Sequence, residues 1–204
     1  DTVEYKHLVP GKEYTVKGIL MDRATGEPFL QNGEQITSEV TFVPKAPSGS
    51  VEVLFTFDAK LIKTDTNIVV FESLYSDSKE LTVHADIEDE DQTVTVYVPK
   101  IKTTASIDGK REITTAGKVT IEDVVSYTNL IPGTEYTIRG TLMNKVTGEV
   151  FTVNGETITA EVKFTPENRN GEVNVTFTFD AHDLTAGTKL VVFESLYREN
   201  VEIA

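Results

Sequence analysis

Residues 1–29 read DTVEYKHLVPGKEYTVKGILMDRATGEPF, and residues 123–151 read DVVSYTNLIPGTEYTIRGTLMNKVTGEVF. The two segments align without a gap. A second pair follows at the same offset of 122 residues: FTFDAKLIKTDTNIVVFESLY at 55–75 and FTFDAHDLTAGTKLVVFESLY at 177–197. A repeat of this length is too long for a solenoid unit and suits a complete domain. The sequence therefore predicts a tandem array of two related domains.

Each repeat has the pattern of an all-β domain. Short segments such as EYTVKGIL, SEVTFV and NIVVFESLY alternate apolar and polar residues, and glycine-rich or proline-rich turns separate them. Asn32-Gly33 and Asn154-Gly155 are candidates for type I′ hairpin turns, because both residue types tolerate positive φ. No stretch has convincing helical periodicity. We expect two tandem immunoglobulin-like antiparallel β-sandwich domains that lack the usual core cysteines and tryptophan.

The joint between the domains is expected at VPKIK, residues 98–102, where a proline interrupts two strand patterns. The domains would then be residues 1–99 and residues 100–204. The segment 101–122 precedes Asp123 but has no counterpart before Asp1, so the first domain is expected to lack its first strand. The second domain ends at Ala204, which aligns with Thr82, and is expected to lack its last strand.

Composition and motifs exclude several classes of function. The chain has no cysteine and a net charge of −14, which opposes binding to nucleic acid or to anionic lipid. It has no apolar run of membrane-spanning length, so membrane insertion of this segment is not expected. It has no glycine-rich phosphate loop, no metal-spaced histidine pair and no GxSxG motif. We expect no cofactor, no metal site and no enzymatic turnover.

One polar residue stands out on the last strand of the first repeat. In QTVTVYV, Gln92 shares a face with Val94, Val96 and Val98, and that face should be buried. A buried amide needs hydrogen-bond partners, or it is there to react.

Other polar residues fall on core faces by the same alternation of strand residues. In IKTTASI, Thr103 faces inward and Thr104 outward. Asp123 shares a face with apolar neighbours, and Asp1 should be inward by the repeat. The VVFESLY strand is apolar on both sides, so its glutamate should be buried in both copies, as Glu72 and Glu194. Buried carboxylates are costly unless paired, which suggests a reaction site.

These segments carry a family resemblance. The stretches TTA, DTVEYKHLVPG, VVFESLY and HADIEDEDQTV resemble the VaFE-type repeats of Gram-positive surface adhesins, over essentially the whole chain. The resemblance implies an autocatalytic intramolecular Thr–Gln ester between the first and last strands of an immunoglobulin-like domain. It also implies structural stalk repeats of a cell-wall-anchored extracellular protein. The partners would be neighbouring repeats, and any host ligand would bind through a domain outside this segment.

The resemblance also assigns roles to individual residues. It implies Gln92 as the ester acceptor and Thr103 as the donor, with Thr104 as the alternative. The assisting groups would be Asp1 or Asp123, Glu72 or Glu194, and His84. A neutral histidine can take the threonine proton, and a protonated carboxyl group can donate to the developing oxyanion.

Several other functions are open at this stage. The run Asp86–Asp91 suggests calcium but lacks the glycine and distal glutamate of an EF-hand, so we interpret it as a solvated acidic run. A ligand-binding adhesin module would need a distinctive loop constellation, which these short loops lack. A Lys–Asn isopeptide domain would need an inward lysine on the first strand, whereas Lys102 is expected to face outward.

The reactive residues are divided between the repeats. Gln92 and His84 belong to the first repeat, Thr103 to the second. We therefore expect that neither unit closes an ester by itself and that the unmodified mass is retained. A peptide carrying the missing strand should add to the open sheet edge and react.

Overall fold

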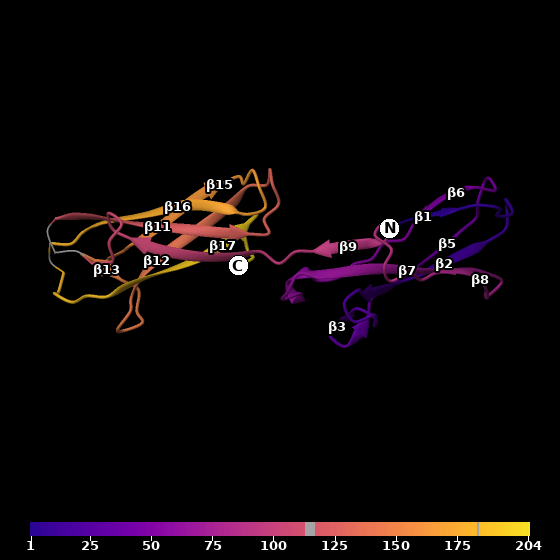
Figure 1. Ribbon diagram of the computed structural model, residues 1–204, viewed down its shortest axis with the longest axis horizontal. Coiled ribbons are helices and arrows are strands. Elements are labelled where there is room, and N and C mark those ends of the chain that lie inside the picture. Colours follow the sequence, from indigo (N-terminus) through magenta and orange to yellow (C-terminus); the bar gives the residue numbers. More distant parts are fainter. Residues whose placement is uncertain (113–116, 183) are drawn as a thin grey trace. The chain divides into compact units, whose positions relative to one another are not determined.

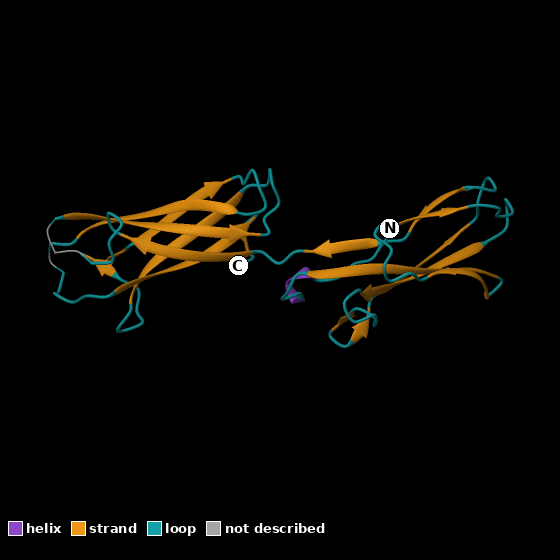
Figure 2. Cartoon of the chain, in the orientation of Figure 1, coloured by secondary structure: helices purple, strands orange, loops and turns teal. Residues whose placement is uncertain are grey.

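The computed structural model describes residues 1–112, 117–182 and 184–204. The chain divides into two compact units, Asp1–Val98 and Pro99–Ala204. Both are built from antiparallel strands, and the one helical element among the described residues is a three-residue 3₁₀ turn, Ala59–Leu61 (Figure 2). The predicted all-β fold is therefore correct. Within the described parts of the chain, no helix is long and apolar enough to cross a membrane.

The Pro99–Ala204 unit is a sandwich of two sheets (Figure 1). One sheet has the order β10-β11-β16, and the other has the order β15-β12-β17-β18. The strands are β10 Lys100–Ser106, β11 Lys118–Thr128, β12 Tyr136–Asn144, β13 Thr152–Val153, β14 Glu156–Thr157, β15 Thr159–Phe164, β16 Gly171–Asp180, β17 Leu190–Arg198 and β18 Val201–Glu202.

The core of this unit lies between the two sheets, as alternating strands require. Alternate residues of β11 and β16 point inward, with Val125, Val175 and Phe177 almost fully buried. Ile138 and Leu196 meet them from the other sheet and are fully buried. This alternation fixes which side chains of each strand share the interior with Asp123.

The Asp1–Val98 unit repeats most of this arrangement. Its strands are β1 Thr2–Tyr5, β2 Tyr14–Asp22, β3 Leu30–Gln31, β4 Glu34–Gln35, β5 Thr37–Phe42, β6 Gly49–Glu52, β7 Thr66–Ser76, β8 Lys79–His84 and β9 Thr93–Val96. The larger sheet has the order β5-β2-β7-β8, with β9 also paired to β7. The facing layer consists only of β1 paired with β6.

The Asn-Gly turns form as the sequence predicts. Asn32 and Gly33 have φ of 53° and 84°, and Asn154 and Gly155 have φ of 52° and 82°. Two positive φ values at the centre of a two-residue loop define the type I′ hairpin. The turns join β3 to β4 and β13 to β14.

The expected burial of Val94 is wrong. Val94 pairs with Ile68 on the core face of β7, yet it is 58 % exposed. In the other unit, β10 packs against β17, the counterpart of β7. No strand of residues 1–98 takes the place of β10, so nothing covers this part of the face.

The expected inward burial of Asp1 is also wrong, for the same reason. The backbone of Asp1 pairs with Val53 through two hydrogen bonds of 2.9 Å, in the register that Asp123 has with Val175. Asp123 has Ala105 of β10 on its other side. Asp1 has no such neighbour, and its side chain is exposed.

Candidate functional site

Asp123 is the most deeply buried charged residue of the Pro99–Ala204 unit, with no exposed surface. It lies in the middle of β11, between Ala105 of β10 and Val175 of β16. Neither of its carboxylate oxygens makes a hydrogen bond of normal geometry with the described residues. Burial raises the pKa of Asp123, and nearby Glu194 and Thr103, with the Thr104 backbone, oppose that rise.

Glu194 approaches Asp123 from the opposite sheet. It sits on β17 directly across from Gly140 of β12, and Phe177 fills the space where a β-carbon at residue 140 would lie. Both carboxylate oxygens of Glu194 are buried without a hydrogen-bond partner in the described structure. Burial and the neighbouring charge of Asp123 raise the pKa of Glu194 to about 8. One of the two carboxyl groups is therefore protonated at neutral pH.

Thr103 lies beside this pair of carboxyl groups. Asp123 of β11 pairs with Ala105 of β10, and Thr103 lies two residues before Ala105. The side chains of Thr103 and Asp123 are therefore diagonal neighbours on the same face of the sheet. Thr103 is partly buried, while Thr104 and Lys102 are exposed. The structure thus brings Thr103, Asp123 and Glu194 together and directs Thr104 away from them.

In the Asp1–Val98 unit, the last strand is interrupted next to the glutamate. β8 places His84 opposite Glu72 of β7. The chain then leaves the sheet and returns so that the backbone carbonyl of Gln92 accepts a 3.1 Å hydrogen bond from the Val70 amide. Because residues 70 and 72 share a face of β7, the loop at 85–91 brings His84 and Gln92 to adjacent positions along that strand.

His84, Gln92 and Glu72 line one cavity of about 420 Å³. Its other side is strand β1, Thr2–Tyr5, whose outer edge has no strand beside it within residues 1–98. In the second unit the equivalent edge of β11 is occupied by β10 and its threonine. The cavity therefore lies where β10 lies in the second unit.

Two buried polar atoms in this cavity have no partner. These are Oε1 of Glu72 and Oε1 of Gln92, neither of which forms a hydrogen bond with any described residue. Both oxygens are therefore available to accept a hydrogen bond within the cavity. Burial raises the pKa of Glu72 to about 7, and the N-terminal amino group partly opposes this rise.

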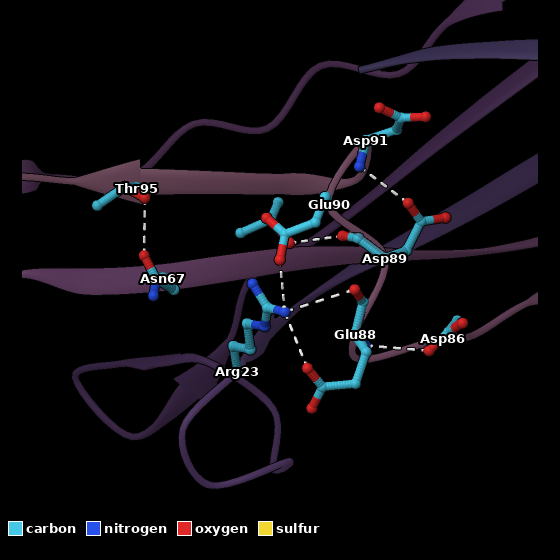
Figure 3. Close-up of polar contacts among 9 residues, drawn as sticks. Arg23, Asn67, Asp86, Glu88, Asp89, Glu90, Asp91 and Thr95 are labelled. Carbon is cyan, nitrogen blue, oxygen red and sulfur yellow. Dashed lines mark hydrogen bonds and ion pairs between the residues drawn. The ribbon is translucent and has the colours of Figure 1, made fainter.

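The acidic segment between β8 and β9 is only partly the solvated run that the sequence suggests. The side chains of Glu88 and Glu90 are largely exposed, but one carboxylate oxygen of each lies 2.8 Å from Nη2 of Arg23 (Figure 3). Asp89 lies 3.0 Å from Nε2 of His84. Among the described residues no cluster of potential ligands suits a metal ion.

Comparison with protein families identifies the repeats. A model of the T-Q ester bond containing domain matches residues 1–96 and 99–204. This chain belongs to that family. The T-Q ester bond containing domain is a structural cross-linked module and not a family of enzymes.

Comparison with solved structures gives weaker likenesses. Two crystal forms of a Mobiluncus mulieris adhesin containing disulfide, isopeptide and ester cross-links match the chain. The first has 21% identity over 50% of this chain and 45% of that one, with a TM-score of 0.42. The second has 14% identity over 85% of this chain and 66% of that one, with a TM-score of 0.38. No curated protein sequence matches the chain significantly.

Sequence reasoning did not single out Arg23 and Asp89, whose contacts join β2 and His84 to the segment between β8 and β9. Arg23 follows strand β2, far from the ester motif in sequence, and carries no periodic signal. Asp89 was one acidic residue among five in Asp86–Asp91. The sheet register brings the segments together: the Arg23 amide donates a hydrogen bond to the carbonyl of Asn67 on β7, and Asn67 pairs with Thr95 of β9, the strand that follows the acidic segment.

Proposed function

We propose that each repeat is a structural stalk module of a bacterial surface adhesin, cross-linked by an ester between a threonine of its first strand and a glutamine of its last. The observation that carries this proposal is the shared glutamate. Glu194 lies with Thr103 and Asp123, and its repeat counterpart Glu72 lies with His84 and Gln92. A complete repeat would then combine a hydroxyl, an amide, two acids and an imidazole around this glutamate.

The proposed reaction needs no external reagent. The threonine Oγ attacks Cδ of the glutamine amide, the Oγ–Cδ bond forms, and the Cδ–Nε2 bond breaks. The threonine proton leaves with the amide nitrogen, so the only other product is ammonia. The reaction occurs once per domain and alters only the chain itself.

The residues of the two half-sites supply the assistance that this reaction needs. The imidazole of His84, on the cavity wall beside Gln92, acts as the base that takes the threonine proton. A raised pKa keeps one acid protonated, as Glu72 or Glu194, so that it donates a hydrogen bond to the amide oxygen as negative charge develops. Asp123 holds the second charge close by and disfavours ionisation of its partner.

A stalk role follows from where the ester would lie. A bond between the first and last strands closes a loop of about 100 residues, which stabilises the domain by roughly 4–5 kcal/mol in the chain-entropy model. Tension entering at one end of the domain would leave at the other through covalent bonds, not through strand hydrogen bonds. Such a module suits a cell-wall-anchored extracellular protein whose partners are its neighbouring repeats.

The cross-link can be tested with the chain and a peptide of its own sequence. A synthetic peptide of residues 100–107, KIKTTASI, should dock along β1 in the cavity of the first unit and react with Gln92. The expected product is a boiling-resistant adduct whose mass is the sum of the two components less one ammonia, measured by intact mass spectrometry. A peptide with Thr104→Val should react equally well, and one with Thr103→Val should not react.

The matched protein variant is Gln92→Glu, which keeps the shape of the side chain. It should give no adduct, because hydroxide is a poorer leaving group than ammonia and the acid ionises more readily. Equal reaction of Gln92→Glu, or reaction of the Thr103→Val peptide through Thr104, would contradict the assignment. Loss of ammonia from the chain alone would contradict the division of the site between the repeats.

The stalk role has a separate test. Residues 100–122 can be duplicated ahead of Asp1, which gives the first unit a strand that precedes Asp1 as β10 precedes Asp123. In single-molecule pulling this unit should not extend beyond its cross-link, whereas the same variant with Gln92→Glu should unfold fully. Full extension of an ester-containing unit would rule out a load-bearing role.

A further inference from the structure

We propose that two phenylalanines, Phe177 and its repeat counterpart Phe55, are positioning residues for the cross-linking reaction: the tip of each ring fills a gap left by a glycine next to the reactive glutamate and closes that side of the site to water. This inference rests on the proposed function, in which the protonated glutamate donates a hydrogen bond to the amide oxygen. Neither phenylalanine reacts. Each acts through the glutamate beside it.

The gap in the second unit lies next to Glu194. Gly140 of β12 pairs directly with Glu194 of β17, so the two residues are neighbours in one sheet. A β-carbon added to Gly140 would lie 2.5 Å from Cζ of Phe177 and 3.3 Å from Cγ of Glu194. The ring tip and the glutamate side chain therefore converge on one point beside the glycine. Phe177 reaches this point from β16, in the opposite sheet (Figure 1).

The first repeat has the same three residues. Gly18 of β2 pairs directly with Glu72 of β7, and Cζ of Phe55 takes the place of a β-carbon on Gly18. Phe55 also packs against the buried cluster that contains Leu20 and Val70. A glycine suits this position in both repeats, because any side chain there would displace the ring.

The ring occupies this gap in both repeats, although only one of the two phenylalanines lies in a strand. Phe177 belongs to β16 and pairs with Ile121 of β11. Phe55 comes after β6 has ended at Glu52 and lies in no strand. The tip of its ring fills the gap at Gly18 all the same. The position of the ring is therefore set by the glycine and the surrounding core, and it forms without a neighbouring threonine strand.

The ring keeps water from groups that would otherwise bind it. Both carboxylate oxygens of Glu194 are buried without a partner among the described residues, and so are both oxygens of Asp123. A small cavity lined by several polar groups holds a water molecule, so a space opened beside these oxygens should fill. Asp123 of β11 is the titratable group that faces Glu194, and Thr103 of β10 is its hydroxyl neighbour. Burial is the largest cause of the raised pKa of Glu194, so water at the carboxyl group should lower this pKa.

Phe177→Leu removes the ring tip and opens such a space. The pKa of Glu194 should fall from about 8 to about 7 or below, measured by NMR titration of its side-chain carboxyl carbon in the full-length chain. Phe179→Leu is the matched control, because Phe179 is buried on the same face of β16 but its ring packs on Phe151. This control should lower stability and leave the pKa of Glu194 unchanged, since an apolar cavity stays dry.

A compensating pair of substitutions separates water exclusion from ordinary packing. When Phe177→Leu is combined with Gly140→Ala, the new methyl group occupies the space that Cζ leaves, so the pKa of Glu194 should return to about 8. An unchanged pKa in Phe177→Leu, or an equal fall in Phe179→Leu, overturns the proposal. A pair that fails to restore the pKa overturns it too.

The first unit connects the ring to the reaction. The ionisable side chains that line the cavity with Glu72 are His84 of β8 and Glu4, Tyr5 and Lys6 at β1, and the N-terminal amino group lowers the pKa of Glu72. Adduct formation with KIKTTASI requires protonated Glu72 in the proposed reaction. The rate should therefore fall as the pH rises through about 7, the pKa of Glu72.

In Phe55→Leu this fall in rate should come at lower pH, because water beside Glu72 lowers its pKa. Phe57→Leu is the control, since its ring packs edge-on against Phe29, and it should keep the parent profile. An unshifted profile in Phe55→Leu overturns the role of the ring in the reaction. If Phe177→Leu does not fold, the NMR titration of Glu72 in Phe55→Leu decides in its place. Absence of adduct with the parent chain overturns the proposed function, while the titrations of the chain alone still decide whether the ring excludes water.

Discussion

Glu194 lies beside Asp123 in the interior of the Pro99–Ala204 unit, and the two carboxyl groups come from opposite sheets of the sandwich. Their four oxygens are buried without a hydrogen-bond partner of normal geometry among the described residues. Such a pair cannot ionise fully without a large cost, because each charge repels the other in a poorly solvated site. The stability of the unit should therefore depend on pH.

The first prediction is that this unit loses stability as the pH rises. Glu194 has its pKa raised from 4.5 to about 8, so between these values the folded state binds more protons than the unfolded state. The free energy of unfolding is then highest below pH 4.5, as far as this group is concerned, and falls as the pH rises through about 8. Urea unfolding followed by NMR signals of this unit at several pH values measures the effect.

Glu194→Gln should flatten this pH dependence, because the amide does not titrate. Glu161→Gln is the control, since Glu161 is exposed and pairs with Arg139 on the surface. It should leave the slope between pH 5 and 8 close to that of the parent. A stability that rises over this range in the parent would show that the carboxyl pair is not buried as described.

The second prediction concerns the Thr103 hydroxyl. It lowers the pKa of Glu194 and of Asp123, against the raising effect of burial. Thr103→Val should therefore raise the pKa of Glu194 further, seen in the pH titration of its side-chain carboxyl carbon by NMR. Thr104→Val, with an exposed side chain, should leave the titration unchanged. A lower pKa in Thr103→Val would place the hydroxyl elsewhere.

The third prediction concerns Gly140. An added β-carbon would lie 2.5 Å from the Phe177 ring and 3.3 Å from Cγ of Glu194. Gly140→Ala should destabilise the unit by about 1–3 kcal/mol, the usual cost of overpacking a core. The exposed Thr159, on the neighbouring strand β15, provides a control as Thr159→Ala, with an expected change within about 0.5 kcal/mol. Equal urea midpoints for parent and Gly140→Ala would contradict this packing.

The fourth prediction concerns the hydroxyl of Tyr136. This buried residue accepts a 3.0 Å hydrogen bond from the Ile131 amide, and Tyr14 does the same for Val9 in the first unit. Tyr136→Phe keeps the ring but leaves the amide unpaired, so it should lower the free energy of unfolding by about 1 kcal/mol. Urea unfolding should show a similar loss in the first unit for Tyr14→Phe. An unchanged stability in both variants would mean that water replaces the hydroxyl.

The sequence pattern identified the two acids that are buried in the strands β7 and β11. Alternation predicted Asp123 as inward, and the apolar residues on both sides of its strand predicted Glu72 as buried; both are almost fully buried. Alternation failed at Asp1 and Val94, which are exposed. Alternation reports which way a side chain points from its own strand, but burial also requires a second layer, and no strand takes the place of β10 in the first unit.

The repeat, the strand pattern, the Asn-Gly turns and the residue types of the reactive set can all be recognised in the sequence. These are local properties, or properties of one segment compared with its copy. Three contacts become visible only in the folded chain: His84 and Gln92 are neighbours along β7, Asp89 contacts His84, and Arg23 contacts the loop that carries Asp89. Those contacts depend on strand register and on the path of the seven-residue loop 85–91, and neither leaves a periodic signal in the sequence.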